Sequence, residues 1–196
     1  MTTARPILYC ADSDEWERWL QDHHESSSGV RLAIAKKGAA HASVSYAEAL
    51  EVALCFGWID GQKASLDDDH YLQAFSPRAA RSIWSRINRQ KALELIAAGR
   101  MRPRGLREVE RAKADGRWDA AYAGQKSAEV PADLAAALEA SPAASEFFGT
   151  LSSQNRYAIL FRIGNVKRAE TRARKITEYV AMLERGETIH PQKRSS

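Results

Sequence analysis

The sequence lacks any apolar run long enough to cross a membrane, because a spanning helix needs about 20 consecutive apolar residues. Its first residues, MTTARPILYC, lack the long apolar core of a secretory signal. The two cysteines, Cys10 and Cys55, are too few for a disulfide framework and favour a reducing compartment. We therefore expect a cytoplasmic protein that does not contact a membrane.

The sequence also lacks several motifs of catalytic and metal chemistry. It has no glycine-rich phosphate loop, no dinucleotide fingerprint and no G-x-S-x-G. Its histidines show no metal-ligand spacing, and the acidic run 67–69 lacks the glycine and the terminal glutamate of a calcium loop. Cys55 lies near the expected end of a helix, where the dipole disfavours a thiolate. We therefore expect no metal site and no bound cofactor.

What is present is an ordinary globular composition with unevenly placed charge. The 196 residues are 44% hydrophobic and 28% charged, which is typical of one well-buried domain with a helical extension. The net charge is −6 for residues 1–75, +8 for 76–117, −4 for 118–155 and +6 for 156–196. The basic segments could form a groove for an anionic ligand or nucleic acid, or they could be solvated helix faces.

Local patterns predict alternating strands and helices in the N-terminal half. Capping-box patterns begin helices at Asp12 and Ser45, and apolar alternation predicts strands over 6–10, 30–35, 58–65 and 70–75. Beyond residue 82 only helices are expected, over 83–98, 105–115, 131–140, 142–151, 153–163 and 167–185.

These elements predict an α+β fold. A small, mainly antiparallel sheet of about four strands, with helices on one side, precedes an all-helical C-terminal half. We expect residues 1–126 to form the α+β core, 127–190 a helical subdomain packed on it, and 191–196 a flexible tail.

The segment 54–88, which contains the hairpin, carries the first candidate site. Residues two apart on a strand share a face, so Trp58, Asp60, Gln62 and Ala64 should point the same way. The length of the turn at 67–69 decides the register. A two-residue turn puts Ala64 opposite Tyr71, whereas a three-residue turn puts it opposite the next residue and sends Tyr71 to the other face.

Asp60 is the candidate acid or base. A carboxylate in mid-strand is costly to bury unless a partner such as Arg78 or a ligand pairs with it. The competing interpretation is an ion pair or cap that fixes the hairpin.

The helix after the hairpin carries the second group of candidates. Ser76 and Ser82 are possible N-caps for a helix that leaves the hairpin immediately. Trp84 and Asn88 would then lie one turn apart with Ser85 between them, as an aromatic plate and two hydrogen-bonding groups. Core packing of the Trp84 indole is the alternative. Trp118 and Asp119, with Tyr122, leave the same two interpretations open.

A chain-long set of motifs resembles a known family. FGWIDG, then a tyrosine, FSPR and S-x-W-S-x-x-N are similar to the YdeI/OmpD-associated family, also labelled bacteriocin-protection proteins. The likeness continues through Gly99-Arg100-Met101 with Gly105-Leu106, Gly116-Arg117-Trp118-Asp119 with Tyr122, and Glu170-Thr171-Arg172. The resemblance implies protection against toxic peptides or antibiotics.

The leading hypothesis is a cytosolic protein that sequesters a small molecule or a peptide-like toxin. Its candidate ligand-binding residues are Trp58, Gln62, Tyr71, Ser76, Arg78, Ser82, Trp84, Ser85, Asn88, Trp118, Asp119, Tyr122 and Arg172.

One alternative is an enzyme that uses Asp60 as a general acid or base on a small aromatic or glycan-like substrate. The other is nucleic-acid binding by the basic segments 76–117 and 156–196. It ranks last because no nucleic-acid motif accompanies the charge.

Overall fold

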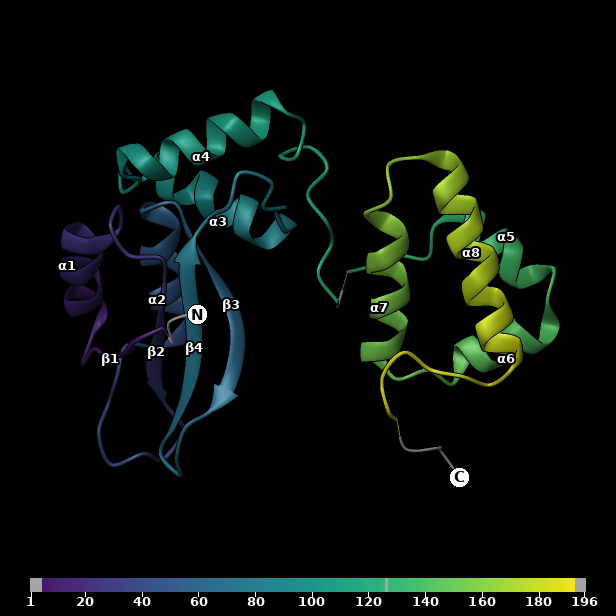
Figure 1. Cartoon of the computed structure of the whole chain (residues 1–196), viewed down its shortest axis with the longest axis horizontal. Coiled ribbons are helices and arrows are strands. Elements are labelled where there is room, and N and C mark those ends of the chain that lie inside the picture. Colours follow the sequence, from purple (N-terminus) through teal and green to yellow (C-terminus); the bar gives the residue numbers. More distant parts are fainter. Residues whose placement is uncertain (1–4, 126, 193–196) are drawn as a thin grey trace. The chain divides into compact units, whose positions relative to one another are not determined.

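The computed structural model describes residues 5–125 and 127–192. It divides the chain into two compact units, Met1–Ala121 and Tyr122–Ser196, and the elements of each are labelled in Figure 1. The predicted domain boundary at residue 126 and residues 193–196 of the predicted tail lie outside the described residues.

The first unit is built on a four-stranded sheet in the order β1-β2-β4-β3. Strands β1 and β2 pair in parallel and the other pairs are antiparallel, which confirms the mainly antiparallel sheet. The elements of this unit are β1 (Ile7–Tyr9), α1 (Ser13–His23), β2 (Val30–Ala35), α2 (Tyr46–Cys55), β3 (Trp58–Ser65), β4 (His70–Pro77), α3 (Arg86–Ala97) and α4 (Pro103–Ala114).

One face of the sheet carries the core of this unit. Val30 pairs with Phe75, and Phe75 pairs with Asp60, so alternate residues of the three strands share this face. The fully buried Val30, Phe75 and Trp58 pack there in one cluster with Trp16 of α1 and residues of α2. The opposite face carries Tyr9, which is 59% exposed. The helices of the core therefore cover one side of the sheet.

The register of the β3–β4 hairpin decides between the two-residue and the three-residue turn. Ala64 pairs with Leu72 and Ser65 with Tyr71, as a three-residue turn predicts. A register shift lies between Asp60 and Lys63, so two residues of β3 stand opposite one residue of β4.

This bulge changes which side chains share a face. Lys63, Ser65 and Tyr71 lie on the same face as Asp60, whereas Ala64 points to the other face. Two predictions are therefore wrong. Ala64 does not share a face with Trp58 and Asp60, and the three-residue turn does not send Tyr71 to the opposite face. The physical reason is that the extra residue of the bulge shifts the in-and-out alternation of β3 side chains by one position from Lys63 onward.

No helix leaves the hairpin immediately, contrary to the prediction. Strand β4 runs to Pro77, because the residue before a proline favours an extended backbone and Ser76 stays in the strand. The Ser82 hydroxyl accepts from the Ala79 N–H at 3.0 Å within the following loop. The N-cap of α3 is Ser85, whose hydroxyl accepts from the Asn88 N–H at 3.1 Å.

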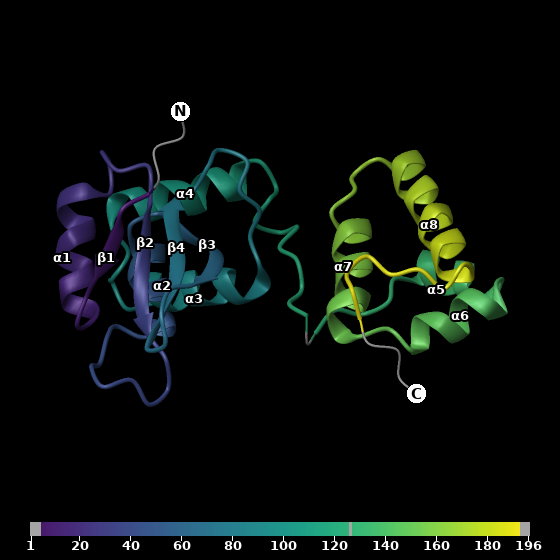
Figure 2. The same cartoon turned by 60° about the horizontal axis from the view of Figure 1, so that its bottom comes forward.

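The second unit is all-helical, as predicted. It contains α5 (Ala132–Glu139), α6 (Pro142–Gly149), α7 (Ser153–Gly164) and α8 (Ala169–Glu184), which Figure 2 shows from a second direction. Leu134, Ile159, Ile163 and Leu183 are fully buried in a core of their own. Across the described residues of both units, every helix is too short or too polar to serve as a membrane span.

Candidate functional site

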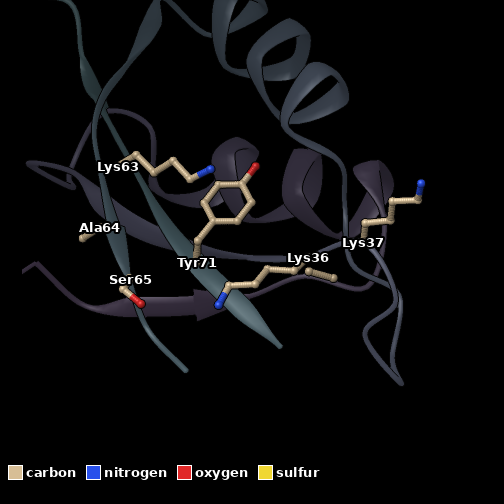
Figure 3. A pocket seen from close by; sticks show the side chains of 7 residues that line it. Lys36, Lys37, Lys63, Ala64, Ser65 and Tyr71 are labelled. Carbon is tan, nitrogen blue, oxygen red and sulfur yellow. The ribbon is translucent and has the colours of Figure 1, made fainter. Parts of the chain in front are cut away.

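A cavity of about 520 Å³ opens at one end of the sheet, beside the turn that joins β3 to β4. We call it the lysine–tyrosine pocket. Its volume lies within the range of roughly 300–1,000 Å³ that small-molecule sites occupy. It is lined by Ala35, Lys36, Lys37, Lys63, Ala64, Ser65 and Tyr71 (Figure 3).

The loop that follows β2 forms one side of the lysine–tyrosine pocket. The backbone N–H of Lys36 donates to the Asp69 carbonyl at 2.7 Å, and its ammonium donates to the Asp67 carbonyl at 2.6 Å. These two bonds hold the loop against the hairpin turn. Lys37 follows directly, and its ammonium forms no hydrogen bond or ion pair with the rest of the described chain.

The hairpin forms the other side of the pocket and supplies its aromatic ring. The Lys63 ammonium lies 3.7 Å from the centroid of the Tyr71 ring, a cation–π contact that fixes both groups. In Figure 3, Lys63 and Lys36 lie on opposite sides of this ring. Burial raises the pKa of the Tyr71 phenol, so its hydroxyl stays protonated at neutral pH and is able to donate a hydrogen bond.

This arrangement suits an anion that carries a small apolar body. Lys63 and Lys36, which lie beside the Tyr71 ring in Figure 3, bring positive charge, and the hydroxyls of Tyr71 and Ser65 can donate to oxygen atoms. The ring of Tyr71 adds apolar wall.

Comparison with known families gives two matches along the chain. Residues 8–108 match the model described as Domain of unknown function (DUF8412), which covers more than half of the chain. Residues 127–186 match the model described as Bacteriocin-protection, YdeI or OmpD-Associated (OmdA). The chain belongs to the DUF8412 family, and its residues 127–186 are similar to the second family. The comparisons with curated proteins and with solved structures found no match.

The motifs that resemble the YdeI/OmpD-associated family are distributed over both matched regions. FGWIDG and FSPR lie within the DUF8412 range, and Glu170-Thr171-Arg172 lies within the OmdA range. The lysine–tyrosine pocket belongs entirely to the DUF8412 region. The OmdA match covers the four helices of the second unit.

Among the sequence-predicted residues of the hairpin, Tyr71 lines the lysine–tyrosine pocket. Trp58 is buried in the core of the first unit, and its indole N–H donates to the His24 carbonyl at 3.1 Å. Asp60 accepts a hydrogen bond from the Tyr46 hydroxyl at 2.9 Å. Gln62 lies in the bulge and is exposed. The role of Asp60 as an acid or base stays a prediction.

The residues around Trp84 form part of the core of the first unit. Trp84 precedes α3, is 2% exposed and meets Trp118 edge-on, with ring centroids 4.9 Å apart. The buried Arg78 guanidinium lies 3.6 Å from the Trp84 ring centroid, and it donates to the Ile83 carbonyl. The burial and packing of the Trp84 indole favour the core-packing alternative.

The remaining predicted residues are dispersed. Asn88 is buried at the start of α3, Ser76 is half-buried in β4, and Asp119 is exposed. Tyr122 belongs to the second unit, where its ring meets Phe161 edge-on at 5.0 Å.

Arg172 holds three helices of the OmdA region together. Its guanidinium donates to both carboxylate oxygens of Asp133 in α5, at 2.5 and 2.9 Å, and to the Ile163 carbonyl of α7 at 2.8 Å. The hydrogen bond from Arg172 is the main cause that lowers the pKa of Asp133. In this position Arg172 acts as a clamp within the second core.

Sequence reasoning missed the lysines and Ser65 of the pocket. Strict alternation along 58–65 puts Lys63 and Ser65 on the face opposite Asp60, because it does not allow for the bulge. Gly61, a glycine inside a strand pattern, was the available signal. In the described part of the chain, no group of three or more His, Cys, Asp or Glu side chains could hold a metal ion.

Proposed function

We propose that this protein sequesters a small molecule or peptide-like toxin by binding an anionic group of the ligand in the lysine–tyrosine pocket. The observation that carries the proposal is the Lys63 ammonium, held 3.7 Å from the Tyr71 ring centroid in the wall of an open cavity. The bacteriocin-protection name of the family matched by residues 127–186 supports a protective role.

The pocket chemistry narrows the ligand class. Lysine ammonium groups attract carboxylate, phosphate or sulfate, and the phenol of Tyr71 adds one directed donor. The apolar wall favours a ligand whose anionic group is attached to a ring or hydrocarbon body. A carboxylate on an aromatic antibiotic, or the C-terminal carboxylate of a peptide, has this chemistry.

We also propose that the protein acts in the cytosol. Its two cysteines are buried and unpaired, a state that persists most readily in a reducing compartment.

Calorimetry with two defined probes tests the binding proposal. Benzoate and N-acetylphenylalanine each join a carboxylate to an aromatic ring, and acetate serves as the probe without a ring. Lys63→Met should weaken binding of both aromatic probes by about tenfold, the value of one charge-assisted contact. Acetate should bind more weakly than benzoate, because it cannot use the apolar wall.

Lys113→Met is the matched control, because Lys113 pairs with Glu110 on α4 and does not line the pocket. It removes the same charge and should leave both affinities unchanged. Equal losses in the two variants would show only a general effect of net charge. Absence of binding by any probe, or no loss in Lys63→Met, would contradict the proposal.

A further inference from the structure

A second cavity, of about 390 Å³, lies at the other end of β3. We call it the arginine groove. His24, Glu25, Phe56, Arg102, Arg104 and Arg107 line it. Trp58 starts β3 and donates to the His24 carbonyl, whereas Lys63 and Ser65 lie near the far end of the strand. At about 3.3 Å per residue, the two cavities are roughly 20 Å apart.

The arginine groove holds more positive than negative charge. Three arginines and one acidic residue, Glu25, line it. Arg102 reaches outward to Glu17 at 2.5 Å. Arg104 donates to the His24 carbonyl at 2.6 Å and has no carboxylate partner among the described residues. The charge of Arg104 is therefore uncompensated within the groove.

Glu25 is held loosely. Its carboxylate lies 3.5 Å from the Arg107 guanidinium and 3.8 Å from the His24 ring nitrogen. Charge-assisted hydrogen bonds are typically about 2.7–2.9 Å long, so neither contact is a close one. The Glu25 side chain is also 68% exposed. A ligand anion with better geometry can displace it at little cost.

We propose that the arginine groove binds the phosphoryl group of a small molecule, with Glu25 occupying its entrance in the free protein. Guanidinium groups match phosphate oxygens bidentately, and three of them line a volume large enough for a phosphate on a small body. Binding replaces the Arg107–Glu25 contact with Arg104 and Arg107 contacts to the phosphoryl oxygens. This site is separate from the lysine–tyrosine pocket.

Calorimetry of the full chain with inorganic pyrophosphate at low salt tests this inference. Arg107→Gln should weaken pyrophosphate binding by about tenfold, since it removes one charge-assisted contact. Glu25→Gln should tighten binding by about three- to tenfold, because it removes a competing negative charge a few ångströms away. Both side chains are mostly exposed, so both variants should fold.

Three matched variants separate this site from other effects. Arg81→Gln removes an exposed arginine outside the groove, and Glu178→Gln removes a carboxylate whose side chain is 60% exposed on α8. Lys63→Met removes the other anion site. All three should leave pyrophosphate affinity unchanged. The inference is overturned if the wild-type chain does not bind pyrophosphate, if Glu25→Gln gives no gain, or if Lys63→Met abolishes binding.

Discussion

Substituting Gly105 with alanine should disrupt the packing of α4 against the end of α2. An ideal Cβ at this position would lie 2.3 Å from the Cys55 carbonyl oxygen and 2.9 Å from that of Leu54. Ordinary van der Waals contact begins at 3.4 Å. Because both obstacles are main-chain atoms at the end of α2, no side-chain rotation can relieve the overlap, and α4 must move away from α2.

The expected change in the free energy of unfolding is the sum of one favourable and two unfavourable contributions. Alanine in place of glycine favours the helix by about 1 kcal/mol. Forcing an extra carbon into a packed contact costs about 1–3 kcal/mol, and more where the backbone must shift. Movement of α4 also stretches the bond from the Arg102 N–H to the Cys55 carbonyl, now 3.1 Å long, with a net loss of about 1 kcal/mol. We expect a destabilisation of about 1–3 kcal/mol.

Urea unfolding followed by tryptophan fluorescence measures this cost selectively. All five tryptophans lie within residues 1–121, so their emission reports the first unit alone. Gly149→Ala is the control, because an added Cβ there has no neighbour within 4 Å and the residue belongs to α6 in the second unit. It should not change the fluorescence transition. An unchanged or raised midpoint in Gly105→Ala would refute the close approach of α2 and α4.

Two further predictions concern buried and paired groups. Arg172→Gln should destabilise the second unit by about 1–2 kcal/mol, seen as a lower helical melting temperature by circular dichroism with no change in the fluorescence transition. Because the hydrogen bond from Arg172 lowers the pKa of Asp133, this stabilisation is present above the unfolded pKa of about 3.9 and is lost as the pH falls below it. If Asp133→Asn lost stability in acid as steeply as the wild-type chain, the stabilising role of the Arg172–Asp133 pair would be contradicted. Burial raises the pKa of the Cys10 thiol to about 12 and that of Cys55 to about 11, so Ellman's reagent at pH 8 should label them only after denaturation. The first unit should also lose stability as the pH rises above about 8.5, where unfolded thiols ionise, and rapid native labelling would argue against their burial.

Local sequence signals were enough to place most elements of the fold. Ser45 and Glu48 form the predicted capping box of α2, with both reciprocal hydrogen bonds present. Such signals act over three or four residues and so survive in any tertiary context. Apolar alternation likewise found all four strands, because the helix-covered face of the sheet must be apolar.

The candidate site was harder to predict because it depends on register. One extra residue near Gly61 moves Lys63 and Ser65 to the face of Tyr71. A local sequence pattern cannot predict this, because the register depends on how two strands pair. The burial of Trp84 depends on Trp118, which is far away in the sequence. Tyr71 was identified as a candidate, whereas its cationic neighbours from the loop after β2 are brought to it only by the sheet.

The most direct test of the central claim is amide NMR of the full chain during titration with benzoate. A ligand anion bound beside Lys63 and Tyr71 should shift the amide resonances of residues 35–37, 63–65 and 71, and Lys63→Met should suppress these shifts. Shifts confined to other parts of the chain, or no shifts at benzoate concentrations that saturate calorimetric binding, would contradict the lysine–tyrosine pocket as the binding site.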